Sequence, residues 1–182
     1  DSINDRADAY GGSIANRARL LVEVLQAITA EIGGGRTGIR LSPITPVNDA
    51  GQDSDPAALY GHVVRQLAPM GLAFLHIIEG QTGGARDLTA KGVPAFDYAA
   101  LRAAAGATPW MLNNGYTRQM ALDTVASGAA DAVAFGKPFI ANPDLGARLR
   151  ADAPWQAIDQ ATLYGGGAAG YTDYPTLHSA AA

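Results

Sequence analysis

Two hydrophobic patterns alternate along the chain, one typical of amphipathic helices and the other of buried strands. From Ile14 to Ile32, apolar residues recur in steps of three and four, which predicts a helix with one apolar face. Ser13 precedes this helix as a natural N-cap, and three glycines at 33–35 follow it as a stop signal. The same pattern predicts further helices over residues 56–70, 96–105, 117–125 and 144–150.

Short and almost continuous apolar runs lie between these helices and predict strands over residues 37–43, 72–78, 109–113 and 131–135. Such strands between amphipathic helices are typical of a parallel sheet covered by helices, which makes the fold class α/β. An open doubly wound sheet and a (β/α)8 barrel both fit this pattern. A complete barrel takes about 250 residues, and the 182 residues here hold about four βα units.

Composition narrows the range of functions. With 48% hydrophobic residues and no obvious linker, we expect one domain over residues 1–182. The absence of cysteine excludes disulfides, thiolate metal sites and cysteine nucleophiles. A net charge of −4 without a basic run argues against nucleic-acid binding, and no apolar run approaches the ~20 residues of a membrane span. Because the chain opens at Asp1 with neither a signal peptide nor a tag, we expect it to be part of a longer product.

Candidate chemistry follows the last two predicted strands, where each ends in a glycine-containing turn. The first turn reads Asn-Asn-Gly-Tyr at 113–116, and the second contains Gly136 and Lys137. Glycine lets a backbone approach a ligand closely, backbone N–H groups bind anions, and Lys137 adds a positive charge. In a barrel, the loops after the last two strands commonly bind phosphate. Ordinary βα turns remain the alternative interpretation.

Arg40 is the charged residue inside a predicted strand. Its neighbours Ile39 and Leu41 are apolar, so strand alternation places Arg40 on the opposite face of the sheet. A charge in a strand is costly unless it is paired. Two interpretations stay open: a salt bridge to Glu79 or Asp131, or contact with an anionic or carbonyl-bearing ligand.

Other polar residues give weaker signals. His76 lies in an apolar strand and is expected to be a satisfied core residue; no histidine has metal-ligand spacing, so we expect no metal site. The acidic residues Asp49, Asp53 and Asp55 are expected to form a solvated loop and a helix N-terminus. The motifs of a nucleophile elbow, a P-loop and a dinucleotide-binding turn are all missing.

Five segments, in family order and with plausible spacing, resemble motifs of the Old Yellow Enzyme family, the FMN-dependent ene-reductases that include N-ethylmaleimide reductase. They are residues 4–17 (N-x-R-x-D-x-Y-G-G-S-x-x-N-R), 38–43 (G-[IV]-R-[LI]-S-P), 135–145 (around G-R-x-[FY]-I-[AS]-N-P-D-L), 164–167 and 170–175 (a terminal signature). The resemblance implies the C-terminal half of a (β/α)8 TIM barrel. The N-terminal half is then expected upstream of residue 1 or on a separate chain.

The resemblance also implies the cofactor-binding residues Arg40, Asn114, Gly115, Tyr116, Gly136, Lys137 and Tyr164. Arg40 would lie beside the flavin pyrimidine ring and stabilise the anionic reduced flavin. Backbone N–H groups at 114–115 and 136–137 would bind the FMN phosphate, with Lys137 as its charge partner. Tyr164 would reach over the flavin, and Tyr116 would contact its edge. Two positions depart from the family pattern. The family usually has Arg where this chain has Lys137, and often has Gly where this chain has Asn114.

The implied activity is an FMN-dependent NAD(P)H:alkene oxidoreductase that reduces activated C=C bonds with NADPH or NADH. In the family, the proton-donating tyrosine precedes the segments matched here, so the catalytic proton donor is expected outside this chain. Open sheet edges would favour association with the missing barrel half or with another copy, and a cytoplasmic location is expected. Two alternatives remain: a phosphate-binding half-barrel without activity of its own, and a sugar-phosphate isomerase-like barrel with Glu79 or Asp131 as its base.

Overall fold

The computed structural model describes residues 1–45, 51–165 and 167–177. The helices in these residues are α1 (Ile14–Ile32), α2 (Pro56–Leu67), α3 (Tyr98–Ala104), α4 (Arg118–Ala126), α5 (Lys137–Ala141) and α6 (Leu145–Ala151), and the strands are β1 (Gly38–Leu41), β2 (Phe74–Ile78), β3 (Trp110–Asn113) and β4 (Ala132–Ala134). Short 3-10 helices occupy Gly34–Arg36, Ala68–Met70, Thr89–Lys91 and Gln160–Thr162. All the predicted helices and strands are confirmed. None of these helices is both long and apolar enough to cross a bilayer.

The chain forms two compact units, each described here by itself. The first comprises Asp1–Tyr116 and Ala121–Ala134 and contains the whole sheet. The second comprises Thr117–Met120 and the chain from Phe135 onward. The expectation of one partial domain over residues 1–182 stays a prediction.

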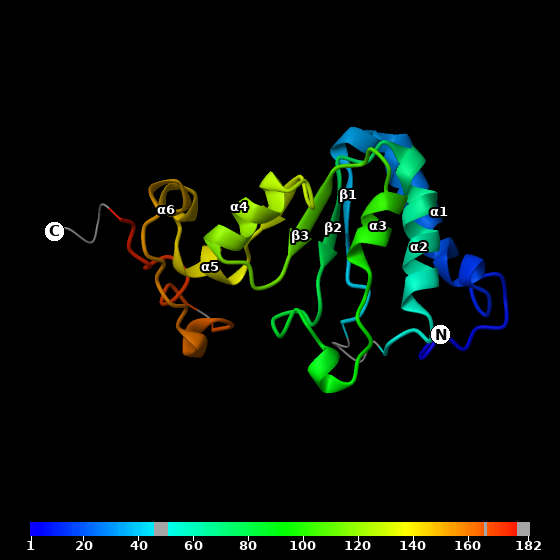
Figure 1. Cartoon of the computed structure of the whole chain (residues 1–182), viewed down its shortest axis with the longest axis horizontal. Coiled ribbons are helices and arrows are strands. Elements are labelled where there is room, and N and C mark those ends of the chain that lie inside the picture. The colour runs from blue at the N-terminus through cyan, green and yellow to red at the C-terminus, as the bar shows by residue number, and fades with distance from the viewer. Residues whose placement is uncertain (46–50, 166, 178–182) are drawn as a thin grey trace. The chain divides into compact units, whose positions relative to one another are not determined.

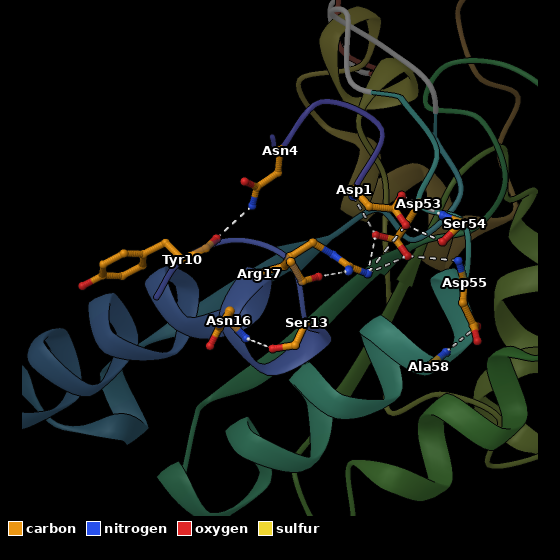
Figure 2. Close-up of polar contacts among 11 residues, drawn as sticks. Asp1, Asn4, Tyr10, Ser13, Asn16, Arg17, Asp53, Ser54, Asp55 and Ala58 are labelled. Carbon is orange, nitrogen blue, oxygen red and sulfur yellow. Dashed lines mark hydrogen bonds and ion pairs between the residues drawn. The ribbon is translucent and has the colours of Figure 1, made fainter. Parts of the chain in front are cut away.

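Side-chain caps fix where the first two long helices begin. The Ser13 hydroxyl accepts a hydrogen bond from the backbone N–H of Asn16 at 3.3 Å, and α1 starts at the next residue. The Asp55 carboxylate likewise accepts from the N–H of Ala58 at 2.9 Å, just before Pro56 opens α2 (Figure 2). Each such cap contributes about 1 kcal/mol. Both helix starts agree with the sequence prediction.

The four strands are parallel and follow one another in the order β1-β2-β3-β4. A doubly wound sheet reverses its strand order at a switch point, whereas a barrel adds strands in sequence. The observed order therefore favours a barrel segment over the doubly wound alternative. Figure 1 shows α1, α2 and α3 on the same side of the strands.

The two faces of the sheet differ in burial. Alternation along the strands sends one set of side chains toward the covering helices, and most of this set is buried, namely Leu41, Leu75, Ile77, Trp110 and Leu112. The other face carries a row set by the strand register, in which Arg40 pairs with His76 and His76 with Met111. Arg40 is exposed, and the other two are half-buried. The hydrophobic core thus lies between the sheet and its helices.

The acidic cluster differs from its sequence prediction at Asp53. Figure 2 shows the Arg17 side chain reaching from α1 to the Asp53 carboxylate, and its Nη2 donates to the two carboxylate oxygens at 3.0 and 3.1 Å. Only 11% of the Arg17 side chain and 6% of the Asp53 side chain are exposed. The prediction of a solvated loop is therefore wrong at Asp53, because a buried carboxylate is tolerated where a cation pairs with it. Asp55 is a helix N-cap as predicted, and Asp49 lies outside the described residues.

Candidate functional site

The turn after β3 has an unusual backbone that its neighbours hold in place. Asn114 has a φ of 117° and Gly115 a φ of 66°, so two successive residues adopt left-handed conformations. The buried Asn114 amide donates to the backbone oxygens of Glu79 at 2.6 Å and Gln81 at 2.9 Å. Gly115, in contrast, is exposed. The sequence therefore places a fixed turn here, with its central peptide accessible.

Tyr116 follows this turn and is 5% exposed. Its hydroxyl donates to the Glu79 carboxylate at 2.5 Å and accepts from Arg86 Nη2 at 3.1 Å. Arg86 also pairs with Glu79 at 2.9 Å, and its guanidinium lies 4.1 Å from the centre of the Tyr116 ring. Burial first, and then the hydrogen bond to Glu79, raise the pKa of Tyr116, so its hydroxyl stays protonated.

A cavity of about 450 Å³ adjoins this cluster in the first unit. Glu79 and Arg86 form part of its wall, and Ile44, Phe96 and Tyr98 contribute apolar and aromatic surface. The Tyr98 hydroxyl accepts from the backbone N–H of Gly80 at 2.8 Å. The cavity therefore combines one cation, Arg86, and two carboxylates, Glu79 and Asp87, with an aromatic wall.

Arg40 does not form either of the predicted salt bridges. Glu79 pairs with Arg86, and Asp131 pairs with Arg102 at 3.1 Å. Within the part of the chain that the structure describes, no carboxylate forms an ion pair with Arg40. The salt-bridge interpretation is therefore wrong, since both proposed partners pair with other arginines.

His76 is the cross-strand neighbour of Arg40. Burial, and then the positive charge of Arg40, lower the pKa of His76 below its ordinary value, so the imidazole is neutral near pH 7. Its Nε2 atom is buried and has no hydrogen-bond partner among the described residues. The prediction of a satisfied core histidine is therefore wrong for this atom. A cation and a neutral imidazole thus lie side by side on the face of the sheet away from the helices.

In the second unit, Gly136 and Lys137 are exposed where α5 begins. A buried Asn142 supports this segment: its amide nitrogen donates to the Pro138 oxygen at 2.7 Å, and its amide oxygen accepts from the Gln156 N–H at 2.8 Å. Sequence reasoning missed this role of Asn142, although an asparagine directly before a proline is a turn signal. Five residues are also too few for α5 to show a hydrophobic period.

The remaining site predictions are placed as follows. Tyr164 is 97% exposed, and Gly166 of the same motif lies outside the described residues. Arg40 and the 114–116 turn belong to the first unit, and Gly136, Lys137 and Tyr164 to the second. In the described residues, no group of three or more histidine, aspartate or glutamate side chains is placed to hold a metal ion.

Each of the two units, taken by itself, exposes donors of the kind that an anionic cofactor such as FMN requires. A Cβ added at Gly136 would meet nothing within 4 Å, and at Gly115 only the Arg86 side chain at 3.9 Å. Both peptides are therefore open to a ligand that approaches the backbone. Arg40 and Lys137 are exposed cations, which suit a phosphate and a ring that becomes anionic on reduction.

Comparison with known proteins identifies the class. The model of the NADH:flavin oxidoreductase / NADH oxidase family matches residues 1–156. The chain belongs to this family, which includes the old yellow enzymes. Its four parallel strands match part of the barrel in solved structures of the family.

Individual relatives agree with this assignment. The chain is 43% identical to 12-oxophytodienoate reductase 1 of Oryza sativa subsp. japonica, over 97% of this chain and 46% of that protein. It is 37% identical to the old yellow enzyme homologue from Zymomonas mobilis, with a TM-score of 0.86 over 96% of this chain and 48% of that one. Morphinone reductase in complex with tetrahydroNAD is 38% identical, with a TM-score of 0.82 over 96% and 45%. The chain thus spans about half the length of the relatives it matches.

Proposed function

We propose that this chain is part of an FMN-dependent NAD(P)H:alkene oxidoreductase that reduces activated C=C bonds. Family membership supports a flavin reaction. The observation that carries the proposal is Arg40, an exposed cation without a carboxylate partner in the described residues, beside a histidine of lowered pKa. A cation at this place would stabilise negative charge that develops on a reduced flavin ring.

The proposed cofactor-binding residues are Arg40, Asn114, Gly115, Tyr116, Gly136, Lys137 and Tyr164. In the first unit, the exposed Gly115 peptide would donate to the FMN phosphate, and Asn114 would set the conformation of that turn. In the second unit, Gly136 offers an open peptide and Lys137 a positive charge. Tyr116 would lie at the flavin edge, and the exposed Tyr164 would cover the flavin. Bound FMN supplies hydride transfer from NADPH or NADH to an activated alkene.

A barrel half outside these 182 residues would complete the protein. Relatives that are about twice as long support this partner, and so does the half-buried sheet face that carries Arg40. The proton donor for the second carbon of the alkene would come from that half. The cytoplasmic location and a homo-oligomer stay predictions.

The test uses the protein that carries this chain together with its barrel half. We expect it to purify with a yellow chromophore and, without oxygen, to oxidise NADPH or NADH over many turnovers only when an activated alkene such as N-ethylmaleimide is added, since the flavin alone accepts a single hydride equivalent. A preparation that contains no flavin and cannot be reconstituted with FMN would contradict the proposal. Flavin binding without turnover would instead support a phosphate-binding module. An isomerase-like barrel is disfavoured because both candidate bases, Glu79 and Asp131, are paired with arginines.

A further inference from the structure

The turn at 114–116 is anchored on both sides of an exposed centre. On one side, the Asn114 amide donates to the backbone oxygens of Glu79 and Gln81. On the other side, the Tyr116 hydroxyl donates to the Glu79 carboxylate. Gly115 lies between these anchors and is exposed. One residue, Glu79 at the end of β2, therefore holds both flanks of the turn.

Arg86 completes this arrangement from the long connection between β2 and α3. Its guanidinium lies over the Tyr116 ring and donates to both the Tyr116 hydroxyl and the Glu79 carboxylate. The nearest atom to a Cβ built on Gly115 is Cδ of Arg86, at 3.9 Å. The stem of Arg86 therefore lies beside Gly115, while its guanidinium holds the neighbouring Tyr116.

Such restraint has a physical purpose in this turn. A φ of 117° at Asn114 is rare for a residue other than glycine, so the turn persists only because its surroundings hold it. A free turn would sample many orientations of the Gly115 N–H, and binding would then include the entropic penalty of ordering it. Arg86 also neutralises the Glu79 carboxylate, which would otherwise repel an anion near the turn.

We propose that Glu79, Arg86 and the Tyr116 hydroxyl form a latch whose role is to aim the Gly115 N–H at the phosphate of FMN. Glu79 and Arg86 are positioning residues that act through the turn rather than on the flavin. This inference rests on the proposed function, in which Gly115 contacts the phosphate. The raised pKa of Tyr116 agrees with it, since the hydroxyl keeps its proton for Glu79.

The test compares FMN with riboflavin, which has the same ring system but no phosphate. Dissociation constants are measured by flavin fluorescence for the protein that carries this chain with its barrel half, and for the variants Tyr116→Phe and Glu79→Gln. We expect FMN to bind about tenfold more weakly to both variants, the factor that corresponds to about 1.4 kcal/mol. Riboflavin should bind to Glu79→Gln, which changes no residue proposed to contact the flavin, as it does to the unchanged protein.

Tyr98→Phe is the matched control. It removes the same phenolic hydroxyl from the wall of the same cavity, but Tyr98 bonds to Gly80 and not to the turn. We expect this variant to keep both affinities. The ³¹P resonance of bound FMN provides a second readout, which should shift in Tyr116→Phe and stay in place in Tyr98→Phe.

Three other outcomes would contradict the latch, the phosphate site or both. If FMN and riboflavin weaken together in Glu79→Gln, the cluster supports the fold only and the latch is refuted. Unchanged FMN affinity in both variants refutes it as well, while the proposed function stands. If the unchanged protein binds riboflavin as tightly as FMN, the phosphate site itself is refuted and the latch with it.

Discussion

The two faces of the sheet differ in what they contribute to the protein. Toward the helices, Leu75, Ile77 and Trp110 are at most 1% exposed and form the centre of the core. Away from the helices, His76 and Met111 on the same two strands are half-buried, and Arg40 on the neighbouring β1 is exposed. A charge on the helix-covered face would be desolvated without a partner, whereas on the other face it stays accessible to a ligand. The residues that stabilise the fold and the residues that could contact a ligand therefore alternate along the strands and lie on opposite faces of the sheet.

The largest effect that would test this separation is the loss of core volume on the helix-covered face. Ile77→Ala should lower the free energy of unfolding of the 182-residue chain by about 2–5 kcal/mol, because Ile77 is fully buried and the residues around such a site relax only partly into the cavity. Urea denaturation followed by circular dichroism measures this change. Met111→Ala, on the opposite face of the adjacent strand, should lower the free energy of unfolding by clearly less than Ile77→Ala does. Equal losses in the two variants would show that the two faces are not distinct in energy.

Arg40 provides the converse test, with an effect on chemistry rather than on stability. In the flavin-bound complete protein, Arg40→Met should make the flavin reduction potential more negative by about 30 mV or more, the shift that corresponds to tenfold for a two-electron couple. The reason is the loss of a cation that stabilises the reduced, anionic ring. A potentiometric titration measures it, with urea denaturation alongside to confirm that stability is little changed.

Arg36→Met is the control for Arg40→Met. Arg36 is also exposed, but it lies before the start of β1, whereas Arg40 lies near the end of that strand. Arg36→Met changes the net charge by the same amount as Arg40→Met, and it should leave the flavin reduction potential unchanged. If both variants shift the potential alike, the effect is one of overall charge and Arg40 has no special position.

The sequence was sufficient to predict the separation of the two faces but not the contacts between residues far apart in the chain. Alternation around Arg40 and the caps Ser13 and Asp55 are local patterns, and local patterns survive folding. The pairs Arg17–Asp53 and Glu79–Tyr116 join residues 36 and 37 positions apart, and no periodicity relates them. Partner choice there depends on how loops fold over the sheet, which local propensity does not determine.

Arg86 is a second residue whose role cannot be predicted from the sequence. It lies in a glycine-rich connection between β2 and α3 that shows neither a helical nor a strand period, so nothing in the sequence marks it. Only the folded chain shows that its guanidinium covers the Tyr116 ring. Glu79, in contrast, follows a predicted strand directly, but that position suggested a partner for Arg40 or a base, not its contact with Tyr116.

The smallest expected effect concerns pH and the half-buried row of the sheet. Burial, and then the charge of Arg40, lower the pKa of His76, so below its ordinary pKa of 6.5 the unfolded chain binds more protons than the folded one. Stability should therefore be highest above about pH 6.5 and fall as the pH drops toward the folded-state pKa. His76→Gln should lack the loss of stability at low pH that comes from the imidazole. Urea midpoints measured between about pH 7.5 and 5.5 test this. Arg40→Met should weaken it only in part, because burial, the larger cause, remains. An unchanged slope in His76→Gln would show that the imidazole is as well solvated in the folded chain as in the unfolded one, and the face away from the helices would then be open along its whole length.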